Sequence, residues 1–158
     1  MKYIIAAATL VTLVACHDDN HAVTPTPPSP EFTATKTYVL ALNGRQAVPM
    51  NDSIRTASST VQLDENTQQL QATLDTANLP EFTAAHIHAG DIGEIGGVVF
   101  PFNTPDSNGL ASIDVSDLTD EQLQTLLSGD WYINLHTTLV PSGEVRAQIV
   151  PNTTTIYT

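Results

Sequence analysis

The chain has 158 residues, with five Lys and Arg against seventeen Asp and Glu, and a formal net charge of −12. This excess of negative charge repels the phosphate backbone, so we exclude nucleic-acid binding. The hydrophobic fraction of 41% is sufficient for one domain with its own core. One interpretation of this charge is that it keeps a folded domain soluble, and the alternative is that it attracts divalent cations.

The first 15 residues are typical of a removable export signal. Lys2 supplies a positive start, and an apolar run extends from Ile4 to Val14. The run is too short for a transmembrane helix and suits the core of a signal peptide. It ends in Leu13-Val14-Ala15-Cys16, which resembles the lipobox of bacterial lipoproteins.

The lipobox resemblance implies a diacylglycerol group on the thiol of Cys16, cleavage before this residue and acylation of the new amino terminus. Several acyl chains give durable anchoring where one chain does not. Because Cys16 is the only cysteine, no internal disulfide can form. We expect a lipoprotein anchored in the bacterial cell envelope by its lipid, facing the periplasm or the cell exterior. The alternative is an ordinary secretory signal in which the cysteine has no role.

Residues 16–34 are expected to form a lipidated tether rather than part of a folded domain. Four prolines lie between Pro25 and Pro30, and they favour an extended polyproline conformation over helix or sheet. His17 and His21 also lie in this segment, where we expect no functional role for them. The folded domain is predicted to span residues 35–151, with residues 152–158 as a C-terminal tail.

Alternation of apolar and polar residues predicts that the domain is built mainly of strands. The expected strands are Thr37–Leu42, Ser58–Leu63, Gln69–Leu74, Ala84–His88, Gly97–Phe102, Gly109–Val115, Trp131–Thr137 and Glu144–Val150. The second and third form a hairpin, and so do the last two. Seven or eight short strands with one helix predict an all-β fold, an antiparallel Greek-key sandwich or barrel.

The one expected helix lies between Leu118 and Gly129. Thr119 is a natural N-cap, and Gln122 is placed to complete a capping box. Three leucines at helical spacing form an apolar stripe that we expect to face the core, and Gly129 ends the helix.

Three separated motifs resemble those of the chordin-like (CHRD) domain family. The motifs are Leu42-Asn43-Gly44-Arg45-Gln46-Ala47-Val48-Pro49, Ala85-His86-Ile87-His88-Ala89-Gly90 with Gly93 and Gly97-Val98-Val99, and Trp131–Thr137 with Pro141–Ile149. The resemblance covers about residues 36–150. It implies an all-β sandwich found in secreted and lipid-anchored bacterial proteins and in an animal antagonist of growth factors. The family supplies no established catalytic residues.

The polar faces of three expected strands carry the candidate site. His86 and His88 alternate with apolar neighbours and therefore point to the same side of their strand. In the final hairpin, pairing of the two apolar faces places His136 near Glu144 and Asn134 near Arg146. Three imidazoles are thus expected on one polar side.

Neutral imidazoles are ligands for zinc and copper(II), and the nitrogens of a His-x-His pair on a strand are close enough to share one ion. We therefore predict a metal site at His86, His88 and His136. Glu144, or Asp91 in the following loop, would supply an oxygen ligand or accept a hydrogen bond that fixes an imidazole tautomer. The alternative is structural: the histidines form hydrogen bonds that close the sheet face and hold the Gly90–Gly97 loop.

These features predict a non-enzymatic binding module. Ser142 has no neighbouring base, and the glycine-rich loop lacks the lysine and helix of a phosphate cradle. An alternative function is a structural or adhesive module that binds a protein or glycan without metal. A third is a redox enzyme of the copper-zinc superoxide dismutase type, which the absence of a disulfide and the small number of histidines disfavour.

Overall fold

A computed structural model describes residues 30–150. The signal, Cys16, both tether histidines and the tail after residue 150 lie outside the described residues. The elements in chain order are β1 (Lys36–Asn43), a 3₁₀ turn η1 (Gly44–Gln46), β2 (Thr56–Asp64), β3 (Gln69–Asp75), β4 (Phe82–Ala89), β5 (Val98–Pro101), β6 (Leu110–Val115), α1 (Asp120–Ser128), β7 (Trp131–Thr137) and β8 (Val145–Gln148).

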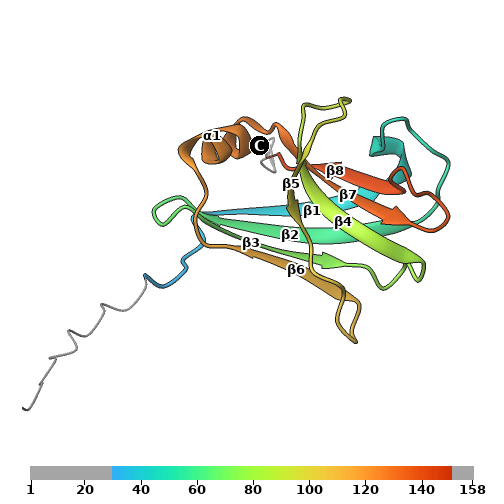
Figure 1. Ribbon diagram of the computed structural model, residues 1–158, viewed down its shortest axis with the longest axis horizontal. Helices are drawn as coiled ribbons and strands as arrows, with labels where there is room; N and C mark the ends of the chain where they lie inside the picture. The colour runs from blue at the N-terminus through green and yellow to red at the C-terminus, as the bar shows by residue number, and fades with distance from the viewer. Residues whose placement is uncertain (1–29, 151–158) are drawn as a thin grey trace, which may run out of the picture.

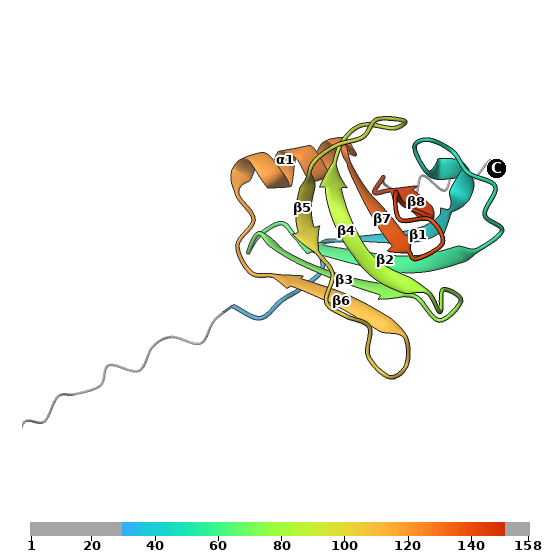
Figure 2. The ribbon, with the colours of Figure 1, turned by 45° about the vertical axis from the view of Figure 1, so that its right-hand side comes forward.

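The eight strands form one antiparallel sheet in the order β5-β4-β7-β8-β1-β2-β3-β6. The sheet curls so that β4, β5 and β7 cross over β1, β2, β3 and β6 (Figures 1 and 2). Its two edges meet where the Asn103 amide donates a hydrogen bond to the Ser112 carbonyl at 2.9 Å. Neighbours such as β1 and β8 are far apart in sequence, as a Greek-key arrangement requires. The prediction of an all-β sandwich or barrel is confirmed.

Alternation within the strands creates the core. In β3, Leu70, Ala72 and Leu74 are buried while the residues between them are not. Leu70 lies opposite Leu63 of β2 and Val115 of β6, so side chains from three strands meet on the same face. A register slip of one residue would move this whole apolar set to solvent.

Helix α1 has the predicted termini. The Thr119 hydroxyl accepts a hydrogen bond from the Gln122 amide, and the Gln122 side chain accepts one from the Thr119 amide. Gly129 ends the helix with φ of 86°, a left-handed conformation that glycine adopts without steric cost. Leu126 is fully buried in the core, and Leu123 and Leu127 pack against it.

Strand ends differ from the predicted ones by a few residues, and two local differences bear on the site. The 3₁₀ turn η1 was not expected; the Asn43 side chain caps it by accepting hydrogen bonds from the amides of Arg45 and Gln46. Strand β8 begins at Val145, one residue later than predicted, because Gly143 has φ of 123°. Strand alternation therefore does not extend back to Glu144.

Replacing Leu126 with alanine should lower the free energy of unfolding by about 2–5 kcal/mol, because it leaves a cavity between α1 and the sheet. Urea unfolding followed by fluorescence of the single, buried Trp131 measures the change. Leu139→Ala is the matched control, since Leu139 is exposed and its loss should cost less than about 1 kcal/mol. Equal losses in both variants would contradict this assignment of the core.

Candidate metal centre

The outward face of β4 and β7 brings three imidazoles together. Strand pairing places His86 opposite Asn134, His88 opposite Tyr132, and His136 opposite Ala84. The ring centroids of His86 lie 5.6 Å from His88 and 5.3 Å from His136. Each residue offers a ligand nitrogen, and these nitrogens all lie within 4.8 Å of one another. Within residues 30–150 this is the one such group of histidine, cysteine and acidic side chains.

Two backbone carbonyls fix the orientation of two of the three rings, those of His88 and His136. His88 Nδ1 lies 3.0 Å from the Gly96 carbonyl oxygen, and His136 Nδ1 lies 2.9 Å from that of Pro141. A carbonyl only accepts hydrogen bonds, so each Nδ1 carries a proton, and in the neutral form of either ring Nε2 carries the lone pair. This arrangement is the one in which metal-ligating histidines are commonly held.

Two of the imidazole nitrogens are buried without a hydrogen-bond partner. They are His88 Nε2 and His86 Nδ1. The third ring has a weak partner, because the Asn134 amide nitrogen lies 3.4 Å from His136 Nε2. Burial of an unsatisfied polar atom costs about 1–3 kcal/mol, so the cluster is destabilising unless a further group occupies it.

The surroundings favour the neutral form of His86 and His88. Burial is the main cause that lowers the pKa of His86, and the neighbouring His136 and His88 lower it further. Burial also lowers the pKa of His88, and the hydrogen bond to Gly96 opposes this effect only in part. Neutral imidazole is the form that binds metal ions.

One wall of the site is a stack of three side chains. The Tyr132 ring lies parallel to His88, with centroids 4.9 Å apart and an interplanar angle of 8°. The Arg146 guanidinium lies 3.5 Å from the centroid of Tyr132, a cation–π arrangement. Arg146 is only 3% exposed, and it donates hydrogen bonds to the carbonyls of Glu94 and Asp91.

The loop between β4 and β5 closes over this stack. The Gly96 amide donates to the Tyr132 hydroxyl, while its carbonyl accepts from His88. A Cβ at Gly96 would lie 1.3 Å from the carbonyl oxygen of Ala89, so only glycine permits the loop to fold back this closely. The predicted tight loop is thus the element that orients His88.

A small pocket of about 120 Å³ opens beside the imidazoles. Its lining includes His88, His136, Tyr132, Asn134 and Arg146. The histidine cluster therefore has an accessible side, and that side carries polar and cationic groups.

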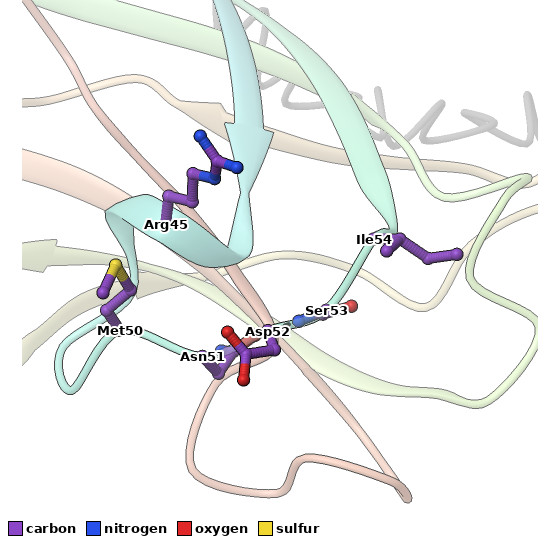
Figure 3. A pocket seen from close by; sticks show the side chains of 6 residues that line it. All are labelled: Arg45, Met50, Asn51, Asp52, Ser53 and Ile54. Carbon is purple, nitrogen blue, oxygen red and sulfur yellow. Dashed lines mark hydrogen bonds between the residues drawn. The ribbon is translucent and has the colours of Figure 1, made fainter.

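Two further hollows lie along the segment that follows β1. The larger, of about 540 Å³, is lined by Arg45 and by Met50 to Ile54 (Figure 3). It brings together only one basic and one acidic side chain, with no histidine. The second, of about 250 Å³, lies between Arg45 and Arg146. It shares Val48 and Arg146 with the pocket beside the imidazoles.

The two predicted carboxylate partners lie elsewhere. The Glu144 carboxylate accepts hydrogen bonds from Thr137 at 2.5 Å and Ser53 at 2.7 Å, with Arg55 Nε at 3.6 Å. The prediction that it shares the polar face of His136 is wrong, because Thr137 belongs to the inward face and the strand geometry begins only after Glu144.

Asp91 has a different role from the predicted one. Its side chain accepts from the Ile92 amide, and its carbonyl accepts from Arg146. Backbone carbonyls thus fix the imidazole tautomers in place of these carboxylates. The expected pairs Asn134 with Arg146 and Tyr132 with Gln148 are confirmed.

The geometry defines a β-barrel module with one histidine cluster on its outer face. A family model, the CHRD domain, matches residues 38–149. The chain therefore belongs to the CHRD domain family. Searches of the curated proteins and of the solved structures found no match. Between residues 30 and 150, no helix has the length and apolar character needed to cross a bilayer.

In metal-free protein kept in chelator, stability should fall as the pH is lowered from about 7.5 to 5.5. Below the ordinary histidine pKa of 6.5 the unfolded chain takes up protons, whereas His86 and His88 resist protonation in the folded state because their pKa values are lowered. Urea unfolding at several pH values measures this dependence. The double variant His86→Gln, His88→Gln should show a flatter profile over this range; an unchanged profile would contradict the assignment.

Proposed function

We propose that the protein is an envelope-anchored lipoprotein whose CHRD domain is a non-enzymatic binding module for zinc or copper(II), held by His86, His88 and His136. The observation that carries the proposal is the pair of buried imidazole nitrogens without partners, His88 Nε2 and His86 Nδ1, within a cluster of three ligand atoms. Membership of the CHRD family supports a binding module in general.

A metal explains the cluster better than a purely structural role does. Hydrogen bonds from Nδ1 to Gly96 and Pro141 would serve a structural role, but they leave His88 Nε2 and His86 Nδ1 buried without a partner. The ligand nitrogens of the three rings lie within 4.8 Å of one another. A divalent cation between them satisfies all three nitrogens at once.

The distances allow binding once the rings move together. Two nitrogens on one tetrahedral zinc ion, each about 2.1 Å from it, lie about 3.4 Å apart. The ligand atoms here lie within 4.8 Å of one another, so ring rotations that move each nitrogen by roughly 0.7 Å bring them into range. Three imidazoles and no thiolate favour zinc or copper(II) over copper(I).

The described chain enters the domain at one end of β1, and the histidine site lies toward the other end. The chain enters this strand at Lys36, whereas Asn43 at its other end pairs with Arg146. A lipid on Cys16, joined through the proline-rich tether, would therefore leave the histidine cluster accessible. This placement supports a domain that captures its ligand outside the membrane.

Exposed apolar side chains favour a second candidate function, binding of a protein or glycan without metal. Ile54, Ile92 and Ile95 are 97%, 71% and 73% exposed. Ile92 and Ile95 belong to the same loop between β4 and β5, and exposed apolar side chains that gather on one surface mark interaction sites. Pull-down from envelope extracts with and without chelator separates the two functions, because this second one is indifferent to chelator.

We expect the wild-type chain to bind one zinc or copper(II) ion and to be stabilised by it. At a free metal concentration about 100 times the dissociation constant, the gain is about 2.7 kcal/mol. Titration calorimetry and thermal unfolding measure both effects. The two histidines of the tether provide the matched control: replacing His17 and His21 with alanine should leave binding intact.

Replacing His86, His88 and His136 with glutamine should abolish this binding. Glutamine retains hydrogen-bonding capacity, so the folded state is expected to survive. Circular dichroism checks the fold of this triple variant. Equal metal binding by the triple glutamine variant and the wild type would contradict the proposed site.

Replacing Cys16 with serine should release the protein from the membrane fraction, because a hydroxyl does not form the thioether of the lipid anchor. Fractionation of cells expressing each form, with immunoblotting, measures the distribution. Ser29→Ala, in the same tether, is the control and should remain membrane-bound. Retention of the serine variant in membranes would contradict lipid anchoring at Cys16.

A further inference from the structure

We infer that the pocket beside the histidine cluster accepts a small monovalent anion, of the size of a carboxylate group, at the open coordination position of the metal. This inference rests on the proposed metal site. It concerns residues other than the histidines: Arg146, which lines this pocket, would bind the anion, and the charge of Arg45 in the adjoining hollow would attract it.

The first observation is the distribution of positive charge. Residues 30–150 contain four Lys and Arg side chains. Two of them are neutralised: Lys36 pairs with Glu65 at 3.0 Å, and Arg55 pairs with Glu81.

The other two cations, Arg45 and Arg146, form no ion pair with a carboxylate in the described part of the chain. Both line the same 250 Å³ hollow, which adjoins the imidazole pocket. In Figure 3 the guanidinium of Arg45 is directed away from the nearby Asp52. In a chain with net charge −12, the two cations of residues 30–150 that form no ion pair thus line one hollow.

The second observation is the burial of Arg146. Only 3% of this residue is exposed to solvent. Its hydrogen bonds go to neutral acceptors, which are the carbonyls of Glu94 and Asp91 and the side chain of Gln148. A buried charge without a counter-ion is costly, and an anion beside it offsets that cost.

The third observation is the shape of the pocket. His88 and His136 line it together with Arg146, while His86 does not. A metal with three protein ligands keeps a fourth position open for an exogenous ligand. On a bound ion that position would be reached from the pocket, whose volume is about 120 Å³. A carboxylate group fits this space.

Azide titration of the copper(II)-loaded protein tests the inference, because azide bound to copper(II) gives a charge-transfer absorption band. Formate is the competing carboxylate. The wild type should bind azide and release it to formate. Arg146→Gln should weaken azide binding about tenfold or more, since one charged hydrogen-bond donor is lost.

Because Arg146 is buried and its replacement can disturb the loop, a surface variant gives an independent readout. Arg45→Gln should weaken azide binding about twofold to fivefold at low salt, and the effect should vanish at high salt. Lys36→Gln makes the same change in net charge at the other end of β1 and should have no effect.

The possible failures are distinct. Absence of copper and zinc binding by the wild type would overturn the proposed metal site and this inference with it. Intact copper binding with no azide band, or with azide affinity unchanged in both arginine variants, would overturn the anion pocket alone.

Discussion

The candidate site depends on two backbone hydrogen bonds, from the imidazoles of His88 and His136 to the carbonyls of Gly96 and Pro141. They determine which nitrogen of each ring carries a proton, and so they direct the other nitrogen toward the cluster. The two carbonyls belong to loops, while the rings stand on strands that the core holds rigidly. The orientation of the imidazoles on the outer face of the sheet therefore depends on the packing of side chains on its inner face.

The same sheet register serves both faces. Ile133 and Ile87 lie opposite each other in the core, and the neighbouring pairs, His86 with Asn134 and His88 with Tyr132, point outward. A slip of one residue between β4 and β7 would bury the histidines and expose the isoleucines. The hydrophobic core thus fixes the imidazole positions, although it makes no contact with a ligand.

Much of the fold could be predicted from alternation and helix caps, because these depend on neighbouring residues. The cluster of His86, His88 and His136 could be predicted in the same way, from shared strand faces. The partners of the imidazoles could not, since they are loop carbonyls and any residue type supplies one. Strand alternation predicts the wrong environment for Glu144, because the conformation of the preceding Gly143 ends the regular strand. The burial of Arg146 under the loop between β4 and β5 could not be predicted either, because the only sequence feature that indicates this loop is its glycines.

X-ray absorption spectroscopy of the zinc- or copper-loaded wild-type chain, with Cys16 unmodified, tests the central claim most directly. We predict three imidazole nitrogens at about 2.0–2.1 Å from the metal, one further light ligand and no sulfur. Scattering from sulfur, or a shell containing fewer than three imidazoles, would contradict a metal centre built on His86, His88 and His136.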